Sequence, residues 1–154
     1  MRRFIPSRSR LAGALFALLA AVLAGGWGGT QLTVPELKTR LANAGVGQRP
    51  KICVEIAQLR MADTDKLYSA SDIENAQAAL ADVVAFSELA RDYAIQSHKH
   101  QKQTEIAVRE MTRRLIEIKR SLDAPDQAPV GDAINRLQRV RDDLLTSMFP
   151  KGER

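Results

Sequence analysis

The sequence predicts an all-α protein built of elongated helical hairpins. Three observations support this fold class. Apolar residues recur at steps of three and four along most of the chain beyond residue 33. Glycines and prolines are gathered at a few points that separate these stretches, and Ser/Thr-x-x-Glu capping boxes stand before two of them. The predicted helical domain covers residues 33–149, with helices at about 34–44, 50–69, 72–123 and 129–148.

The amino-terminal segment, residues 1–24, predicts a secretory signal peptide. Four arginines precede the apolar run 11–24, and no acidic residue occurs before Glu36. A run of 14 residues suits a signal peptide, whereas a membrane-spanning helix needs roughly 20 apolar residues. We expect cleavage after Ala24 or Gly26, which leaves a flexible leader over 25–32 and a periplasmic or secreted protein. The alternative is an uncleaved anchor, although four glycines at 25–29 would fray such a helix.

The net charge of +5 belongs mainly to the predicted signal peptide. Of the 23 Lys and Arg, four lie in that segment, so 19 remain against 18 Asp and Glu. Nucleic-acid-binding proteins usually carry an excess of positive charge, and the nearly neutral mature chain does not have one. The single cysteine, Cys53, excludes an intramolecular disulfide framework, so the domain must depend on helix packing.

The first two predicted helices are marked by their ends. Thr33 and Glu36 form a capping box before the helix at 34–44, and Gly45 and Gly47 end it. Pro50 suits the first turn of the helix at 50–69, where its missing amide needs no partner. The buried stripe of that helix is predicted to contain Ile52, Ile56, Leu59 and Leu67.

The segment 72–123 predicts one long central helix. A second capping box, Ser71 to Glu74, opens it. Heptad steps then continue for about 50 residues, with apolar ends and a polar middle at Ser97, Gln101 and Thr104. Because no Gly or Pro interrupts the segment, a continuous helix about 75 Å long is expected. A break around 97–101 is the alternative.

The last predicted helix, 129–148, follows Pro125 and closes before Pro150. It and the helix at 50–69 are each about 20 residues, so each covers only half of the long helix. Short connections require both to fold back antiparallel, one on each half.

Candidate chemical groups do not converge in the sequence. His98 and His100 are the only histidines, and a spacing of two places them on different sides of a helix, unlike helical metal ligands at three or four. Cys53 lies among apolar residues, as a small core residue does. We therefore predict no catalytic, cofactor-binding or metal-binding residues and no cofactor.

A basic run lies within residues 99–120 and could bind an anionic surface. Its members are Lys99, Lys102, Arg109, Arg113, Arg114, Lys119 and Arg120. Acidic residues at helical spacing favour an ordinary exposed face instead, with Glu105 paired to Arg109, Glu110 to Arg114 and Glu117 to Arg120. Aromatic residues that would stack on bases are not interleaved with the run.

Three segments carry a resemblance to known sequences. They are residues 102–108, 126–130 and 139–145. Through them the chain resembles a group of uncharacterised exported bacterial helical proteins, which implies no activity. Residues 67–83 also resemble a single tetratricopeptide hairpin, without a second copy at the 34-residue period that such arrays use.

These patterns together predict an exported, non-enzymatic helical interaction or scaffold protein. A protein partner or self-association is expected, and nucleic acid is not. The alternative is an envelope or membrane-anchored protein that retains its amino-terminal apolar segment and uses the basic helix face on anionic surfaces.

Overall fold

The computed structural model describes residues 31–151, and within them the chain forms five α-helices and no strand. The predicted all-α class is confirmed. The predicted signal peptide at 1–24 and its cleavage sites lie outside the described residues. The helices are α1 (Val34–Asn43), α2 (Arg49–Ser69), α3 (Ile73–Ser97), α4 (Gln101–Ser121) and α5 (Ala124–Met148).

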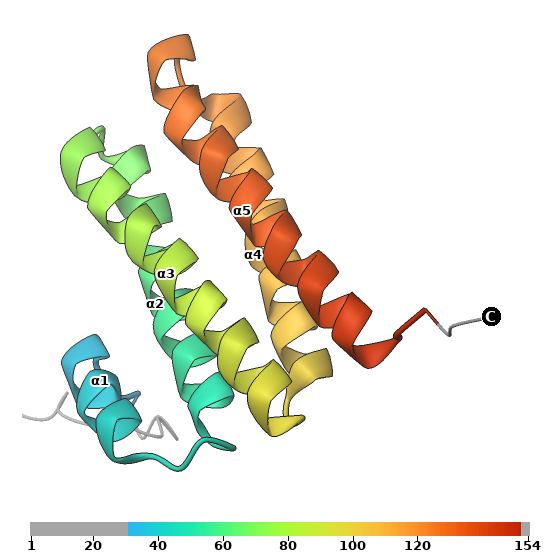
Figure 1. Ribbon diagram of the computed structural model, residues 1–154. Helices are drawn as coiled ribbons and strands as arrows, with labels where there is room; N and C mark the ends of the chain where they lie inside the picture. Colours follow the sequence, from blue (N-terminus) through green and yellow to red (C-terminus); the bar gives the residue numbers. More distant parts are fainter. Residues whose placement is uncertain (1–30, 152–154) are drawn as a thin grey trace, which may run out of the picture. The chain divides into compact units, whose positions relative to one another are not determined.

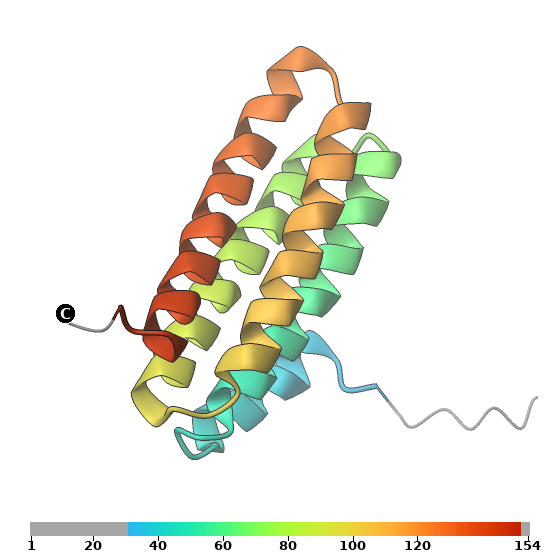
Figure 2. The same cartoon turned by 90° about the vertical axis from the view of Figure 1, so that its right-hand side faces the viewer.

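Helices α2 to α5 form two antiparallel hairpins that pack side by side (Figure 1). One hairpin is α2 with α3, and the other is α4 with α5. The hairpins have the same orientation, so α2 lies beside α4 and α3 lies beside α5 (Figure 2). Helix α1 contacts α2. Each of the four helices α2, α3, α4 and α5 therefore packs on an antiparallel neighbour within its own hairpin and on a parallel neighbour in the other hairpin.

One apolar core joins the two hairpins. Its fully buried members come from all four long helices and include Ala57, Val83, Val108 and Leu137. A smaller cluster of Leu37, Ile52 and Ile56 holds α1 on α2. Most large apolar side chains of the described helices are buried in these two clusters or against them. Their removal from water supplies the main stabilising free energy.

The predicted continuous helix over 72–123 is wrong, and the alternative break is what the structure shows. Helix α3 ends at Ser97 and α4 begins at Gln101. His98 and His100 adopt left-handed backbone conformations, with φ of 54° and 60°, and these reverse the chain. The two halves therefore pack as parts of different hairpins instead of forming one rod. The predicted antiparallel partners are nevertheless confirmed, since α2 packs on α3 and α5 packs on α4.

Two helix starts also differ from the expected ones. Ser71 does not cap α3, because it takes a left-handed conformation (φ 59°) in the α2–α3 turn. Asp72 caps instead, and its carboxylate accepts the Asn75 amide at 3.5 Å. Helix α5 begins at Ala124, five residues earlier than predicted, because Pro125 fits the first turn, where no amide donor is required.

The expected cap of α1 forms through its glutamate. The Glu36 carboxylate accepts the Thr33 backbone N–H at 2.7 Å and the Thr33 hydroxyl at 2.8 Å. The backbone hydrogen bond and then the hydroxyl bond lower the pKa of Glu36, because both favour the carboxylate. These two hydrogen bonds define Val34 as the first residue of α1, the first helix of the described chain.

Candidate functional site

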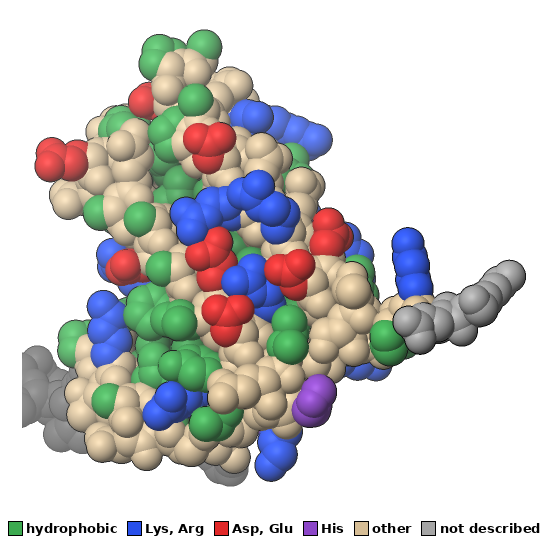
Figure 3. All heavy atoms as spheres, in the orientation of Figure 1, with side chains coloured by type: hydrophobic (Ala, Val, Ile, Leu, Met, Phe, Trp, Pro, Cys, Tyr) green, Lys and Arg blue, Asp and Glu red, His purple; other side chains and the backbone are tan. Residues whose placement is uncertain are grey.

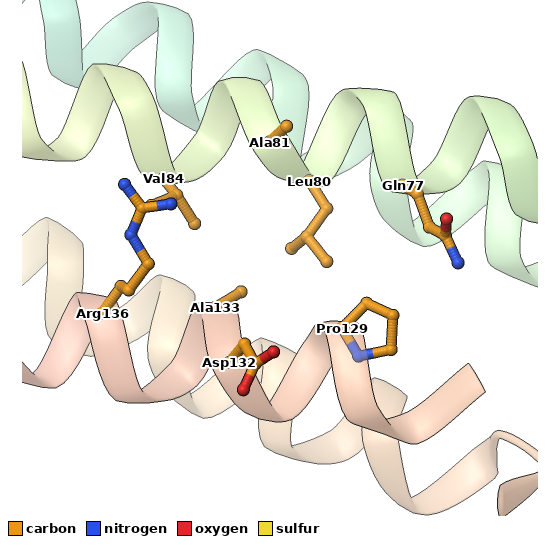
Figure 4. Close-up of a pocket in the computed structure, with 8 residues that line it drawn as sticks. All are labelled: Gln77, Leu80, Ala81, Val84, Pro129, Asp132, Ala133 and Arg136. Atoms are coloured by element: carbon orange, nitrogen blue, oxygen red, sulfur yellow. The ribbon is translucent and has the colours of Figure 1, made fainter. Parts of the chain in front are cut away.

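A groove between α3 and α5 is the candidate functional site. It has a volume of about 220 Å³ and lies between the first halves of the two helices (Figure 4). Both helices run in the same direction here, so their side chains meet across a parallel seam. Eight residues line the groove: Gln77, Leu80, Ala81, Val84, Pro129, Asp132, Ala133 and Arg136.

The groove has an apolar floor and a polar rim. Leu80, Val84 and Ala133 form the floor and are themselves almost fully buried in the core. Ala81, which is exposed, and Ala133 line the groove and have only a methyl group as side chain. Side chains this small leave space that a larger residue would fill, and the groove occupies that space. Arg136 extends from α5 toward α3 beside Val84 (Figure 4).

Ion pairs join α3 to α5 at the polar end of the groove and further along the seam. Arg136 binds Glu88 through two hydrogen bonds of 2.9 and 2.8 Å, the bidentate geometry that guanidinium groups favour. Arg91 binds Asp143 across the same seam at 3.0 Å. Figure 3 shows charged side chains of both signs alternating over the middle of this face. The polar end of the groove is therefore held by paired charges.

The Arg91 guanidinium carries the clearest electrostatic effect of this seam. Burial acts to lower the pKa of Arg91, but the hydrogen bond and charge of Asp92 and the charges of Asp143 and Glu88 outweigh it, so the pKa is raised. The side chain thus stays protonated while a large part of it is covered. It acts as a permanent cation that ties the hairpins together.

Of the seven cations in the basic run, Arg109, Arg113 and Arg114 pair with carboxylates within the described residues, although two of the predicted pairs do not form. Glu105 does approach Arg109, at 4.0 Å, as expected. Arg114, however, pairs with Asp65 of α2 and with Glu117, so the predicted Glu110–Arg114 and Glu117–Arg120 pairs do not form. Glu110 instead pairs with Arg113 at 3.5 Å. Arg114 turns away because it lies beside the α2 seam, where Asp65 is a closer partner.

Cys53 and the two histidines are the residues that the sequence offers for chemistry. Burial raises the pKa of the Cys53 thiol to about 11, although the nearby charge of Arg49 acts to lower it. Its side chain is fully buried, which confirms the predicted burial. The two histidines occupy the α3–α4 loop. Among residues 31–151, no three His, Cys, Asp or Glu side chains are grouped as a metal site would require.

The groove was not predictable from any one segment. Gln77, Ala81 and Asp132 look like ordinary exposed positions of separate helices, because their heptad positions carry no sign of a partner. The groove exists only when α3 and α5 lie side by side, and the sequence gives no signal for that parallel pairing. Periodicity identifies a buried face but not the helix that covers it.

Comparison of the chain with protein family models, with curated proteins and with solved structures finds no match. None of the helices within the described residues combines the length and the apolar character that crossing a bilayer requires.

Proposed function

We propose that this chain is an exported, non-enzymatic helical interaction protein that binds a protein partner through the α3–α5 groove. The observation that carries the proposal is the composition of that groove, an apolar floor bounded by charged and amide side chains. Small hollows of this kind receive the one or two apolar anchors of a partner helix, while the rim fixes its orientation.

The rim supports a specific partner chemistry. Asp132 and Arg136 lie one helical turn apart on α5, and both are exposed. Arg136 is already bound to Glu88, so Asp132 is the carboxylate left to pair with a partner. A helix with an apolar anchor and a basic residue one turn away fits this arrangement. Such a pair adds orientation more than affinity at an exposed rim.

The proposal of export depends on the amino-terminal signal peptide pattern. Mass spectrometry of envelope material should show a chain that begins at Gly25 or Trp27. An intact Met1 form recovered from membranes would instead favour the anchored alternative, in which the basic face of α4 binds anionic lipid. The charge available to that alternative is reduced, because three of the seven cations of the basic run, Arg109, Arg113 and Arg114, are paired with carboxylates.

A photo-crosslinking amino acid at position 81 tests the groove. Ala78 provides the matched control, since it is also an exposed alanine of α3 but does not line the groove. In cells that produce the full chain, position 81 should crosslink to one protein and position 78 should not. The crosslinked protein is then purified and its affinity for the unmodified chain is measured.

Substitution completes the test. Ala81→Arg fills the groove with a charged side chain and should weaken binding of the purified partner about tenfold or more, whereas Ala78→Arg should leave it unchanged. Equal crosslinking from both positions, or unchanged affinity for the Ala81→Arg protein, would show that the groove is not the binding site.

A further inference from the structure

A second hollow lies at the opposite end of the hairpins, between the amino-terminal turns of α2 and α4. Its volume is about 370 Å³, within the range of roughly 300–1,000 Å³ typical of small-molecule pockets. Five residues line it: Lys51, Val54, His100, Gln103 and Thr104. Because α2 and α4 are parallel neighbours, both helix amino termini point to this end (Figure 2).

The charges at this end oppose helix stability. A helix amino terminus carries partial positive charge and is stabilised by acidic residues in its first turn. Neither α2 nor α4 has an acidic residue there, and neither has a side-chain cap. Lys51 and Lys102 occupy those first turns instead, and Lys99 precedes α4. No carboxylate within residues 31–151 approaches these three lysines within 4.0 Å.

Thr104 provides an independent sign of a ligand. It is 1% exposed, it lines the hollow, and its hydroxyl has no hydrogen-bond partner within the described chain. The other buried serine and threonine hydroxyls, those of Thr64, Ser87 and Thr112, donate to the carbonyl four residues earlier at 2.7–2.8 Å. A buried hydroxyl that lacks this bond costs free energy unless another group completes it.

The surface of the hollow is mainly apolar. Val54 lines it together with Lys51, Gln103 and His100, so a ligand here must offer hydrocarbon as well as charge. Two uncapped helix amino termini and unpaired lysines select an anion, and the Thr104 hydroxyl can donate to one of its oxygens. A fully hydrated inorganic ion satisfies the charge but leaves the apolar wall in contact with water.

We propose that this hollow binds an anionic amphiphile, a monocarboxylate with a short hydrocarbon chain. The carboxylate lies at the α4 amino terminus, where it accepts a hydrogen bond from the Thr104 hydroxyl and pairs with Lys51. The hydrocarbon chain lies against Val54. This site is separate from the α3–α5 groove, since the two share no residue, so either proposal can fail without the other.

Octanoate is the probe, and the isotopically labelled full-length chain is titrated with it by NMR. The amide signals of residues 51–54 and 100–104 should shift and saturate. Acetate supplies the carboxylate alone and 1-octanol supplies the hydrocarbon alone, so each should bind at least about tenfold more weakly. Acetate binding as tightly as octanoate would indicate a plain anion site and overturn the proposal, as would absence of a saturable shift.

Two variants locate the ligand. Lys51→Met keeps the methylene stem and removes the charge, and Thr104→Val keeps the shape and removes the hydroxyl. Each should weaken octanoate binding about five- to tenfold. Lys102→Met is the matched control, because Lys102 lies at the same end but does not line the hollow, and its affinity should stay within about twofold. An equal loss in Lys102→Met would show diffuse charge attraction and overturn the site.

Thr104→Val also guards against a folding artefact. It removes an unsatisfied buried hydroxyl, so its thermal midpoint should be equal to or above that of the unchanged chain. If the Thr104→Val variant melts no lower than the unchanged chain and binds octanoate more weakly, the loss of affinity results from the lost hydrogen bond. Undiminished binding by this variant would overturn the role of Thr104 and with it the proposed placement of the carboxylate.

Discussion

Glu105 is the one charged side chain that is buried within the described residues, at 6% exposure. Its carboxylate accepts a hydrogen bond from Arg141 of α5 at 2.7 Å, and Arg109 lies 4.0 Å away. A carboxylate removed from water is tolerated only when cations and donors compensate it. The Glu105–Arg141 pair is therefore a structural link within the second hairpin.

Removal of the Arg141 guanidinium should show how much the Glu105–Arg141 pair contributes to the free energy of unfolding. Arg141→Met leaves the Glu105 carboxylate covered but without its close partner, so the free energy of unfolding should fall by about 2 kcal/mol in urea titrations. Arg113→Met, which breaks the exposed pair with Glu110, should leave the midpoint nearly unchanged. Similar losses in the two variants would contradict the special role of Glu105.

At the scale of the elements, the connections between helices are the unusual feature. Both the α2–α3 turn and the α3–α4 loop use left-handed residues that are not glycine, namely Ser71, His98 and His100. Such conformations cost about 1 kcal/mol or more for a residue with a Cβ atom. The strain is maintained because the packed hairpins fix the path of the chain.

Glycine should relieve that strain. His98→Gly is expected to raise the free energy of unfolding by up to about 1 kcal/mol, because glycine adopts φ near 54° without steric conflict. Ala85→Gly at an exposed position inside α3 is the control and should lower it by about 1 kcal/mol. Thermal melts of the two proteins would decide, and destabilisation by His98→Gly would contradict the strain.

The same loop explains how far the helices could be predicted. Ala76, Leu80 and Val83 in α3 are buried as the heptad steps predict, and so are Val108 and Leu115 in α4. The heptad spacing of the buried residues continues from α3 into α4, because the three-residue loop between Ser97 and Gln101 does not shift it. A heptad pattern records which residues are buried and carries no record of a reversal in direction.

Residue types at the break concealed it further. Glycine or asparagine normally marks a left-handed turn, and here His98, Lys99 and His100 occupy the loop.

At Gly47, by contrast, a glycine is present for a reason that the sequence does not show. A Cβ atom at Gly47 would lie 2.9 Å from the Cδ atom of Lys99, so the glycine allows a close approach that only the folded loop reveals. Both candidate binding hollows are equally hidden, since each requires helices from two hairpins.

At the scale of the whole molecule, the shared core predicts that the hairpins unfold together. Leu137 of α5 is fully buried in the cluster that also contains Ala57 of α2. If the cluster is one cooperative unit, a cavity in α5 must destabilise α2 as well. The buried Cys53 in α2 reports on this, because its thiol reacts only when that helix opens.

Leu137→Ala should therefore accelerate labelling of Cys53 at the far side of the core. The substitution costs about 3 kcal/mol, which corresponds to about a 100-fold rise in labelling rate by a thiol reagent if opening is global. Gln138→Ala, at the exposed neighbouring position, should not change the rate. An unchanged Cys53 rate in Leu137→Ala would show that the hairpins open independently.

The short connections between consecutive helices also have a consequence in time. No more than three residues separate α2 from α3, α3 from α4, or α4 from α5. Loop-closure entropy is then small, and helical hairpins with such local contacts form in microseconds to milliseconds. A ribosome adds roughly 5–20 residues per second. The α2–α3 hairpin thus has thousands of opportunities to close and reopen before α5 exists, and its apolar seam with α5 is the last part of the core to be covered.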